Sequence, residues 1–241
     1  MKAKWHTGQV IDLKHISKSK MEFSIAVVHD EIFEFDPGQF ITMDLPIGDK
    51  RRQRWRSYSI ANIPNDKNIL SFGIGHLEDG LASSYFFEEL KIGDSIKFKG
   101  PDGAFVLPKN LEQPIIMIAT GTGVVPFVSM LRKIVKDQLP FKKIHLIYGC
   151  RFAEDLLYRE ELEMMEQELS SFDLDFVLSK PDTWEGHAGY VHDVYKSVYK
   201  TKSEENLYLL CGWSAMIDEA MANLFPQVAT PARQIKYELY G

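Results

Sequence analysis

Residues 115–126, IIMIATGTGVVP, decide the fold of the half of the chain in which they lie. The five consecutive apolar residues 115–119 are typical of a strand that is covered on both faces of a parallel sheet. Gly121 and Gly123 follow in a tight turn, and Pro126 suits the first turn of a helix, where its missing N–H costs nothing. The pattern predicts a strand, a glycine-rich loop and a helix.

Such a loop can hold a phosphate, because glycines let the backbone approach a ligand and the helix presents N–H groups and a positive dipole end. The loop departs from the GxGxxG fingerprint of ordinary Rossmann dehydrogenases and lacks the Lys-Ser/Thr pair of a P-loop, which disfavours both classes. A plain connecting turn is the alternative, since glycine-rich motifs occur widely.

Downstream of this loop, apolar segments alternate with helical ones. We expect strands over residues 144–148, 174–178, 207–211 and 235–239, and helices over residues 126–136, 158–169, 191–198 and 216–224. Apolar strands that alternate with helices build βαβ units, so this half is predicted to be a doubly wound parallel α/β domain.

The first half of the chain has shorter segments in which apolar and polar residues alternate. Examples are residues 23–28, 39–45 and 70–74, and turn residues lie between such segments at 36–38, 46–49, 64–66 and 92–94. Regularly spaced short strands predict an antiparallel β-barrel, here with one short helix at 83–90. The pattern changes near residues 109–113, which predicts two domains, 1–108 and 109–241.

The composition disfavours several classes of protein. The 241 residues include 28 Lys and Arg against 34 Asp and Glu, a net charge of −6, so a nucleic-acid-binding role is not expected. Cys150 and Cys211 are too few for a disulfide scaffold or an iron–sulfur cluster. Without a signal-peptide core or a membrane-length apolar run, we expect a soluble, cytoplasmic monomer with no membrane insertion. The seven histidines show no ligand spacing, so we expect them at the surface or in turns, and no metal site.

A cluster of positive charge stands out in this acidic chain. Residues 50–59 read KRRQRWRSYS, with five cations in the first seven positions. Alternation along a strand would place Arg54, Arg56 and Tyr58 on one face, where guanidinium groups suit a phosphate and the ring suits a flat ligand. For residues 50–53 a solvated basic loop is the favoured interpretation.

The segment Arg56–Ser59, RSYS, resembles the R-x-Y-S/T flavin motif of the ferredoxin–NADP(H) reductase superfamily. Members of that family join an FAD-binding β-barrel to an α/β domain that binds a nicotinamide nucleotide. Further segments resemble the family's motifs in the same chain order: Gly80–Ser84, Gly93–Asp94, Gly100–Phe105, Gly121–Pro126, Tyr148–Arg151, Leu157–Glu161, Cys211–Gly212 and Glu238–Tyr240. Because the motifs keep this order over nearly the whole chain, coincidence is untenable as an explanation.

The resemblance implies an FAD site. Arg56 would pair with the pyrophosphate, Tyr58 would lie against one face of the isoalloxazine, and Ser59 would lie close to the flavin N5. Tyr240 would cover the opposite face until the nicotinamide displaces it, although Gly241 follows it here, whereas the aromatic residue is the last one in plant-type members. The other FAD-binding residues would be Ser57, Gly80, Leu81, Ala82 and Ser83, the last three through backbone N–H groups.

The resemblance also implies a nicotinamide site. Cys211 would lie near the nicotinamide C4 and Glu238 near the same edge, which makes Ser59, Cys211, Glu238 and Tyr240 the implied catalytic set. The nucleotide would contact Thr120, Gly121, Thr122, Gly123, Arg151, Ser179, Lys180, Cys211 and Gly212.

The choice between NADPH and NADH stays open, with a slight lean to NADPH. Lys180 offers a cation and Tyr190 a stacking ring for the 2′-phosphate end of NADPH, and Arg151 could also reach a phosphate. Ala188, however, stands where a Lys would help.

The implied activity is that of an FAD-dependent NAD(P)H oxidoreductase. A hydride would pass to FAD, and single electrons would leave for a ferredoxin or other iron–sulfur carrier. The basic residues 50–54 could steer an acidic ferredoxin or hold the adenosine end of FAD. Two alternatives stay open: a reductase of diffusible flavins or quinones, and a flavin-free binding or regulatory module of the same shape.

Overall fold

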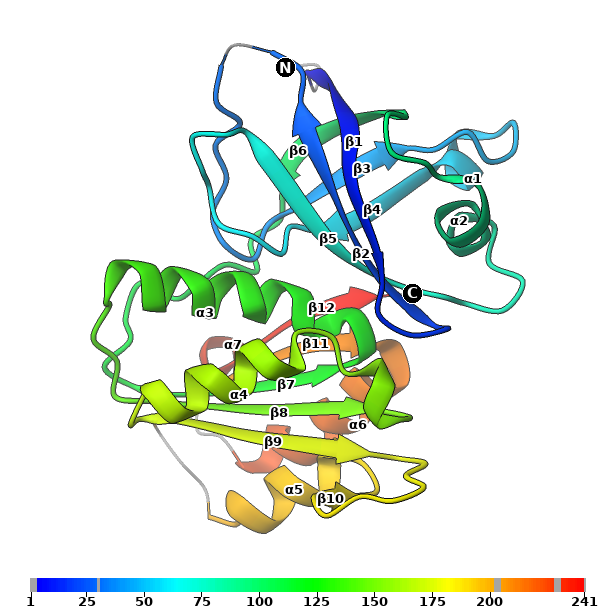
Figure 1. The fold of residues 1–241 in the computed structure, drawn as a ribbon. Coiled ribbons are helices and arrows are strands. Elements are labelled where there is room, and N and C mark those ends of the chain that lie inside the picture. Colours follow the sequence, from blue (N-terminus) through cyan, green and yellow to red (C-terminus); the bar gives the residue numbers. More distant parts are fainter. Residues whose placement is uncertain (1–3, 30, 202–204, 228–230, 241) are drawn as a thin grey trace. The chain divides into compact units, whose positions relative to one another are not determined.

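A computed structural model describes residues 4–29, 31–201, 205–227 and 231–240 of the chain (Figure 1). The chain divides into two compact units. One unit comprises Met1–Leu107 and Val128–Lys133, and the other comprises Pro108–Phe127 and Ile134–Gly241. The boundary between residues 108 and 109 stays a prediction. We call the two parts the barrel unit and the α/β unit and describe each by itself.

The barrel unit contains a six-stranded antiparallel sheet in the order β4-β3-β6-β1-β2-β5. Its strands are β1 (Trp5–His15), β2 (Lys20–Val27), β3 (Phe40–Asp44), β4 (Trp55–Ser59), β5 (Ile69–Gly75) and β6 (Ser95–Asp102). Just beyond β4, the N–H of Ala61 donates to the carbonyl of Ser71 in β5 at 2.7 Å, so the two edge strands are joined. The predicted antiparallel barrel is confirmed.

Strand β2 shows why these segments are strands. Met21, Phe23, Ile25 and Val27 are buried, whereas the residues between them are only partly buried. Successive side chains of a strand point to opposite faces, so one face of β2 packs in the barrel core and the other does not. A one-residue shift in register would expose this whole apolar set, and this fixes the pairing.

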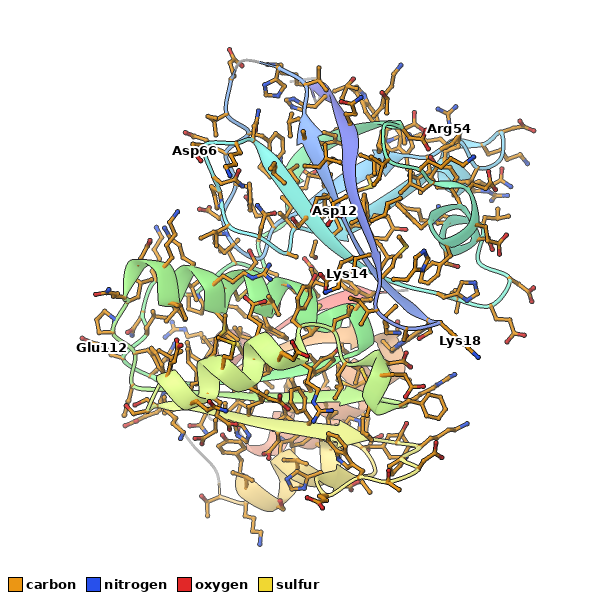
Figure 2. All side chains as sticks on the ribbon, in the orientation of Figure 1. Asp12, Lys14, Lys18, Arg54, Asp66 and Glu112 are labelled. Atoms are coloured by element: carbon orange, nitrogen blue, oxygen red, sulfur yellow. The ribbon has the colours of Figure 1, made fainter. Side chains whose placement is uncertain are left out.

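The basic segment before β4 differs from the expectation. Residues Arg51–Arg54 form a short helix, α1, and β4 begins only at Trp55. Arg54 therefore does not share a strand face with Arg56 and Tyr58. Its guanidinium instead donates from Nε and Nη2 to the two carboxylate oxygens of Asp44, at 2.8 and 2.6 Å (Arg54 is labelled in Figure 2). This bidentate ion pair holds Arg54 against β3.

The α/β unit contains a six-stranded parallel sheet in the order β10-β9-β8-β7-β11-β12. Its strands are β7 (Pro114–Thr120), β8 (Lys143–Cys150), β9 (Phe172–Leu178), β10 (His187–Ala188), β11 (Leu207–Trp213) and β12 (Ile235–Tyr240). Its helical segments are η2 (Gly121–Val124), η3 (Ala153–Asp155), α4 (Arg159–Glu168), α5 (Val191–Val198), α6 (Ser214–Leu224), η4 (Phe225–Gln227) and α7 (Pro231–Gln234). Helix α3 (Val125–Asp137) belongs to it at both ends, whereas residues 128–133 of that helix count with the barrel unit.

Helices cover both faces of this sheet, as the predicted doubly wound fold requires. Helices α5 and α6 pack in one apolar cluster with Ile116 and Ile118 of β7, and α4 lies over the opposite face (Figure 1). No helix among the described residues has the length and apolar character needed to cross a membrane.

The strand order reverses at β7, which pairs with β8 on one side and with β11 on the other. In open parallel sheets, ligands bind beyond the carboxyl ends of the strands at such a switch point. Thr120 ends β7 and Trp213 ends β11, so both lie at the edge where this fold class predicts a ligand.

Two of the seven histidines contradict the expectation that all lie at the surface or in turns. His145 in β8 and His192 in α5 are only 4% and 6% exposed. Each has a hydrogen-bond partner that offsets the cost of burial: Tyr199 hydroxyl for His145 and Tyr195 hydroxyl for His192, both at 2.8 Å.

Candidate functional site

Arg56 is positioned by the backbone around it. Its Nη1 atom donates to the carbonyl oxygens of Arg52 and Trp55, both at 2.8 Å. In the part of the chain that the structure describes, no carboxylate forms an ion pair with Arg56. A fixed guanidinium without an acidic partner is suited to bind an external anion.

Tyr58 lies two residues further along β4, on the same strand face as Arg56. Its ring packs against the barrel core and meets the ring of Phe86 edge-on, with 5.2 Å between centroids. Burial raises the pKa of the Tyr58 phenol well above its usual value, so the ring stays neutral at any physiological pH. It thus offers a rigid, uncharged aromatic face.

The two serines of the segment lie on the other face of β4. The hydroxyl of Ser57 hydrogen-bonds to Thr42 in β3 at 3.0 Å, and Ser59 is buried. The structure therefore separates Ser57 and Ser59 from the face that carries Arg56 and Tyr58.

The segment Gly80–Ser83 begins a short helix, α2 (Leu81–Ser84), which continues into a π-helical turn, η1 (Tyr85–Glu89). The N–H of Ser84 donates to the carbonyl of Gly80 at 2.9 Å, so the three N–H groups before it have no acceptor within the helix. The Ser83 hydroxyl instead fixes the turn, through bonds to the carbonyls of Leu77 and Gly80. The groups of this turn that could bind an anion are therefore its backbone N–H groups.

The barrel unit thus offers a cation, backbone N–H groups that have no acceptor within their own helix, and an aromatic face. The ring contact between Tyr58 and Phe86 of η1 shows that the strand and the helical segment lie together. A flavin dinucleotide combines a negatively charged pyrophosphate with a flat aromatic ring system, so these groups fit FAD.

In the α/β unit, the two glycines of the loop after β7 have different neighbours. Gly121 has a φ of +56°, and the nearest atom to a Cβ placed there would be Nε1 of Trp213, at 3.7 Å. A Cβ on Gly123 would lie 2.2 Å from the carbonyl oxygen of Cys211. Gly121 leaves room for a ligand, whereas the absence of a side chain at Gly123 makes room for β11.

The ends of β7 and β11 approach each other closely at Thr120 and Gly212. Gly212 has a φ of +145°, and a Cβ there would lie 2.2 Å from Oγ1 of Thr120. The same oxygen accepts a hydrogen bond from the N–H of Trp213 at 3.3 Å. Thr122 lies between the two loop glycines and is half-buried. These contacts give the switch point a fixed backbone.

Trp213 was not among the predicted site residues. Its side chain is 55% exposed and approaches Gly121. The sequence feature that could have identified Trp213 is its position directly after the Cys-Gly pair, which follows an apolar run.

Strand pairing brings together three of the predicted catalytic residues. Cys211 lies opposite Glu238, and Trp213 lies opposite Tyr240, in the β11–β12 ladder. Burial raises the pKa of the Cys211 thiol well above its usual value, the nearby charge of Glu238 raises it further, and a hydrogen bond with Tyr240 partly opposes both. Cys211 is therefore a neutral, polarizable contact and not an activated nucleophile.

The state of this thiol can be tested by alkylation. We expect iodoacetamide at pH 8 to modify Cys211 in the native protein roughly 100-fold more slowly than a free thiol, because only an accessible thiolate reacts. Both cysteines should be modified after unfolding, and peptide mass spectrometry measures each site. Modification of native Cys211 at the rate of a free thiol would contradict its burial and its raised pKa.

Two predicted nucleotide-binding cations lie side by side at the same edge of the sheet. The N–H groups of Ser179 and Lys180 donate to the carbonyls of Cys150 and Arg151, both at 3.0 Å. The Arg151 and Lys180 side chains are exposed, at the carboxyl ends of β8 and β9. A pair of cations at this edge suits a phosphate group. Among the described residues, no three His, Cys, Asp or Glu side chains gather as a metal site would require.

Comparison with known proteins matches both units. Residues 7–107 match the family described as an oxidoreductase FAD-binding domain, and residues 117–221 match the oxidoreductase NAD-binding domain. The electron transfer component of toluate 1,2-dioxygenase from Pseudomonas putida is 30% identical over 227 residues, which are 94% of this chain and 65% of that protein. This chain therefore spans less than two thirds of that relative.

Two further comparisons cover more of the matched protein. NADH-cytochrome b5 reductase 1 from Mortierella alpina is 30% identical over 212 residues, 87% of this chain and 70% of that protein. The crystal structure of a ferredoxin NADP+ reductase from Neisseria gonorrhoeae with bound FAD and NADP has a TM-score of 0.80 at 22% identity, and covers 99% of both chains. At this identity the structural match shows a shared fold.

Proposed function

Because this chain belongs to the ferredoxin–NADP(H) reductase superfamily, we propose that it takes a hydride from a reduced nicotinamide nucleotide onto FAD and passes single electrons to an iron–sulfur protein. The observation that carries the proposal is the pairing of two sites in one chain. The barrel unit offers Arg56, which has no carboxylate partner among the described residues, beside an aromatic face. The α/β unit offers an open glycine turn at the switch point of a parallel sheet.

In the barrel unit, Arg56 would hold the FAD pyrophosphate, with the N–H groups of Leu81, Ala82 and Ser83 as further donors. Tyr58 would lie against the isoalloxazine, and Ser57, Ser59 and Gly80 would support the segments that carry these groups. FAD, when bound, supplies a centre that accepts two electrons as a hydride and releases them singly. The protein's own contribution there is to bind and orient.

In the α/β unit, Thr120, Gly121 and Thr122 would hold the nucleotide at the end of β7, while Gly123 and Gly212 keep β7 and β11 close enough to form that loop. Cys211, Glu238 and Tyr240 are proposed to line the nicotinamide end. The Cys211 thiol, which keeps its proton, would provide packing and would not add to the nicotinamide ring as a thiolate could.

The proposed electron acceptor is a ferredoxin or the iron–sulfur component of an oxygenase. The relative from Pseudomonas putida is the electron transfer component of a dioxygenase, and the two cysteines of this sequence cannot ligate a cluster by themselves. We place the activity in the cytoplasm, where reduced nicotinamide nucleotides are generated.

Steady-state assays test this choice of acceptor. The FAD-loaded protein is given NADPH or NADH and either a ferredoxin or free riboflavin, and kcat/KM is compared between the two acceptors. We expect the ferredoxin to be preferred. A strong preference for riboflavin would reject an iron–sulfur partner in favour of a diffusible acceptor.

The nucleotide preference is tested by Lys180→Ala. If Lys180 meets the 2′-phosphate of NADPH, its loss should raise the KM for NADPH by about two- to fivefold, the size expected for an exposed charge contact, and leave the KM for NADH unchanged. Lys67→Ala, an exposed change in the barrel unit, is the matched control. Equal KM values for NADPH in wild type and Lys180→Ala would remove Lys180 from the phosphate site.

A further inference from the structure

Three strands of the α/β unit are linked by a chain of side chains to which the proposed reaction assigns no role. Asp175 in β9 bonds through Oδ2 to Nε2 of His145 in β8 at 2.8 Å, and through Oδ1 to Nε2 of His187 in β10 at 3.0 Å. The other ring nitrogen of His145 bonds to the hydroxyl of Tyr199, just after α5, at 2.8 Å. Because a carboxylate only accepts, both Nε2 atoms carry a proton.

The sheet register explains why these residues meet. His145 lies opposite Asp173, and Asp175 is two residues further along the same strand. His187 lies opposite Val177, which is two residues beyond Asp175. Residues two apart on a strand share a face, so the three side chains lie in a row across one face of the sheet.

The His187–Asp175 bond fastens a segment that carries proposed nucleotide-binding residues. Residues 179–190 leave the sheet at Ser179 and Lys180 and return to it at β10. Strand β10 has only two residues, and the N–H of Gly189 donates to the carbonyl of Leu178 at 2.9 Å. With so short a ladder, a side-chain bond from β10 to β9 is a substantial part of what holds this return in place.

We propose that the bond between His187 and Asp175 is a latch that holds residues 179–190 against the sheet and thereby strengthens nucleotide binding. The proposal rests on the proposed function, because the segment begins with Lys180. His187 is a positioning residue in this account and contacts no substrate.

The surroundings of the latch keep Asp175 as the acceptor of both bonds. The His145 hydrogen bond is the main cause that lowers the pKa of Asp175, so this carboxyl stays ionised at neutral pH. The Nδ1 atom of His145 can accept a hydrogen bond from the hydroxyl of Tyr199, whose pKa burial raises. Asp173, which pairs with Lys143, is the other charged group beside the network. His187 is half-exposed and donates from Nε2 to the Asp175 carboxylate.

The size of the expected effect follows from the exposure of this bond. A partly exposed hydrogen bond to a carboxylate changes an equilibrium by about two- to fivefold.

Hydrogen exchange tests the latch without any nucleotide. After correction for intrinsic rates, we expect amides in residues 180–189 to exchange about two- to fivefold faster in His187→Ala than in the wild-type protein. His187→Gln keeps a donor and should restore most of this protection. The control His76→Ala, an exposed change in the barrel unit, should leave the protection unchanged. The same protection in His187→Ala and in wild type would overturn the latch.

Nucleotide binding tests the consequence. The Kd of the holoprotein for NADPH should rise about two- to fivefold in His187→Ala, and His187→Gln should restore it, with kcat unchanged in both variants. A wild-type Kd in His187→Ala would overturn the link to nucleotide binding even if the exchange difference is present. If neither NADPH nor NADH binds the wild type, the proposed function fails, and the exchange result alone decides on the latch.

Discussion

Replacing Arg56 by alanine is expected to weaken FAD binding by about 10- to 100-fold. A hydrogen bond to a charged group contributes about 1.5–3 kcal/mol, and each 1.4 kcal/mol is a factor of ten in Kd. The Arg56 guanidinium is held by two backbone carbonyls and has no carboxylate partner among the described residues, so no other interaction of the folded protein would replace the lost contact. Titration of the FAD-free protein with FAD, followed by flavin fluorescence, measures the effect.

Two variants show whether the loss belongs to the Arg56 charge. Arg52→Ala removes an exposed cation four residues away but leaves the carbonyl that positions Arg56, so FAD should bind as in wild type. Arg56→Lys keeps the charge without the guanidinium fork and should give an intermediate Kd. Wild-type FAD affinity in Arg56→Ala would contradict the assignment of this residue to the pyrophosphate.

The second large effect is expected for Gly123→Ala. The new Cβ would lie 2.2 Å from the carbonyl oxygen of Cys211, and the backbones on both sides are fixed by the parallel ladder between β7 and β11. Relieving such a contact must move one strand end, which costs about 1–3 kcal/mol of stability. We expect a lower unfolding temperature for the α/β unit and a sharply raised KM for NAD(P)H, with unchanged FAD affinity. Thermal unfolding and nucleotide-dependent flavin reduction measure these effects.

Gly121→Ala is the matched control for this variant. Its Cβ would have no neighbour closer than 3.7 Å, so the cost is confined to the left-handed φ of +56°, about 1 kcal/mol. Its loss of stability should therefore be the smaller of the two. A larger loss of stability in Gly121→Ala than in Gly123→Ala would contradict the different roles assigned to these glycines.

The comparison of these glycines shows where sequence reasoning succeeds and where it stops. The apolar run 115–119, the turn after it and Pro126 in the first turn of α3 are local features, and each was predicted. The helix Val191–Val198 was also predicted, since its apolar residues repeat at helical spacing. The neighbour of Gly123, however, is Cys211, nearly ninety residues away, and only the strand order brings the two together.

The same limit applies to the basic segment and to the histidines. Alternation predicts a shared face for Arg54 and Arg56 only if the strand reaches Arg54. In the structure Arg54 instead ends a short helix, from which it forms its ion pair with Asp44. His145, Asp175 and His187 have no local spacing that marks them as a group. Their contact depends on the register of three strands.

The central claim is that this protein binds FAD in the barrel unit and reduces it with a nicotinamide nucleotide. The most direct test is to mix the FAD-loaded protein anaerobically with NADPH or NADH and follow the visible absorbance of the flavin. The account predicts stoichiometric FAD binding that depends on Arg56, and rapid loss of the oxidised-flavin absorbance with at least one nucleotide. A protein that takes up no FAD, or whose bound FAD neither nucleotide reduces, would contradict it.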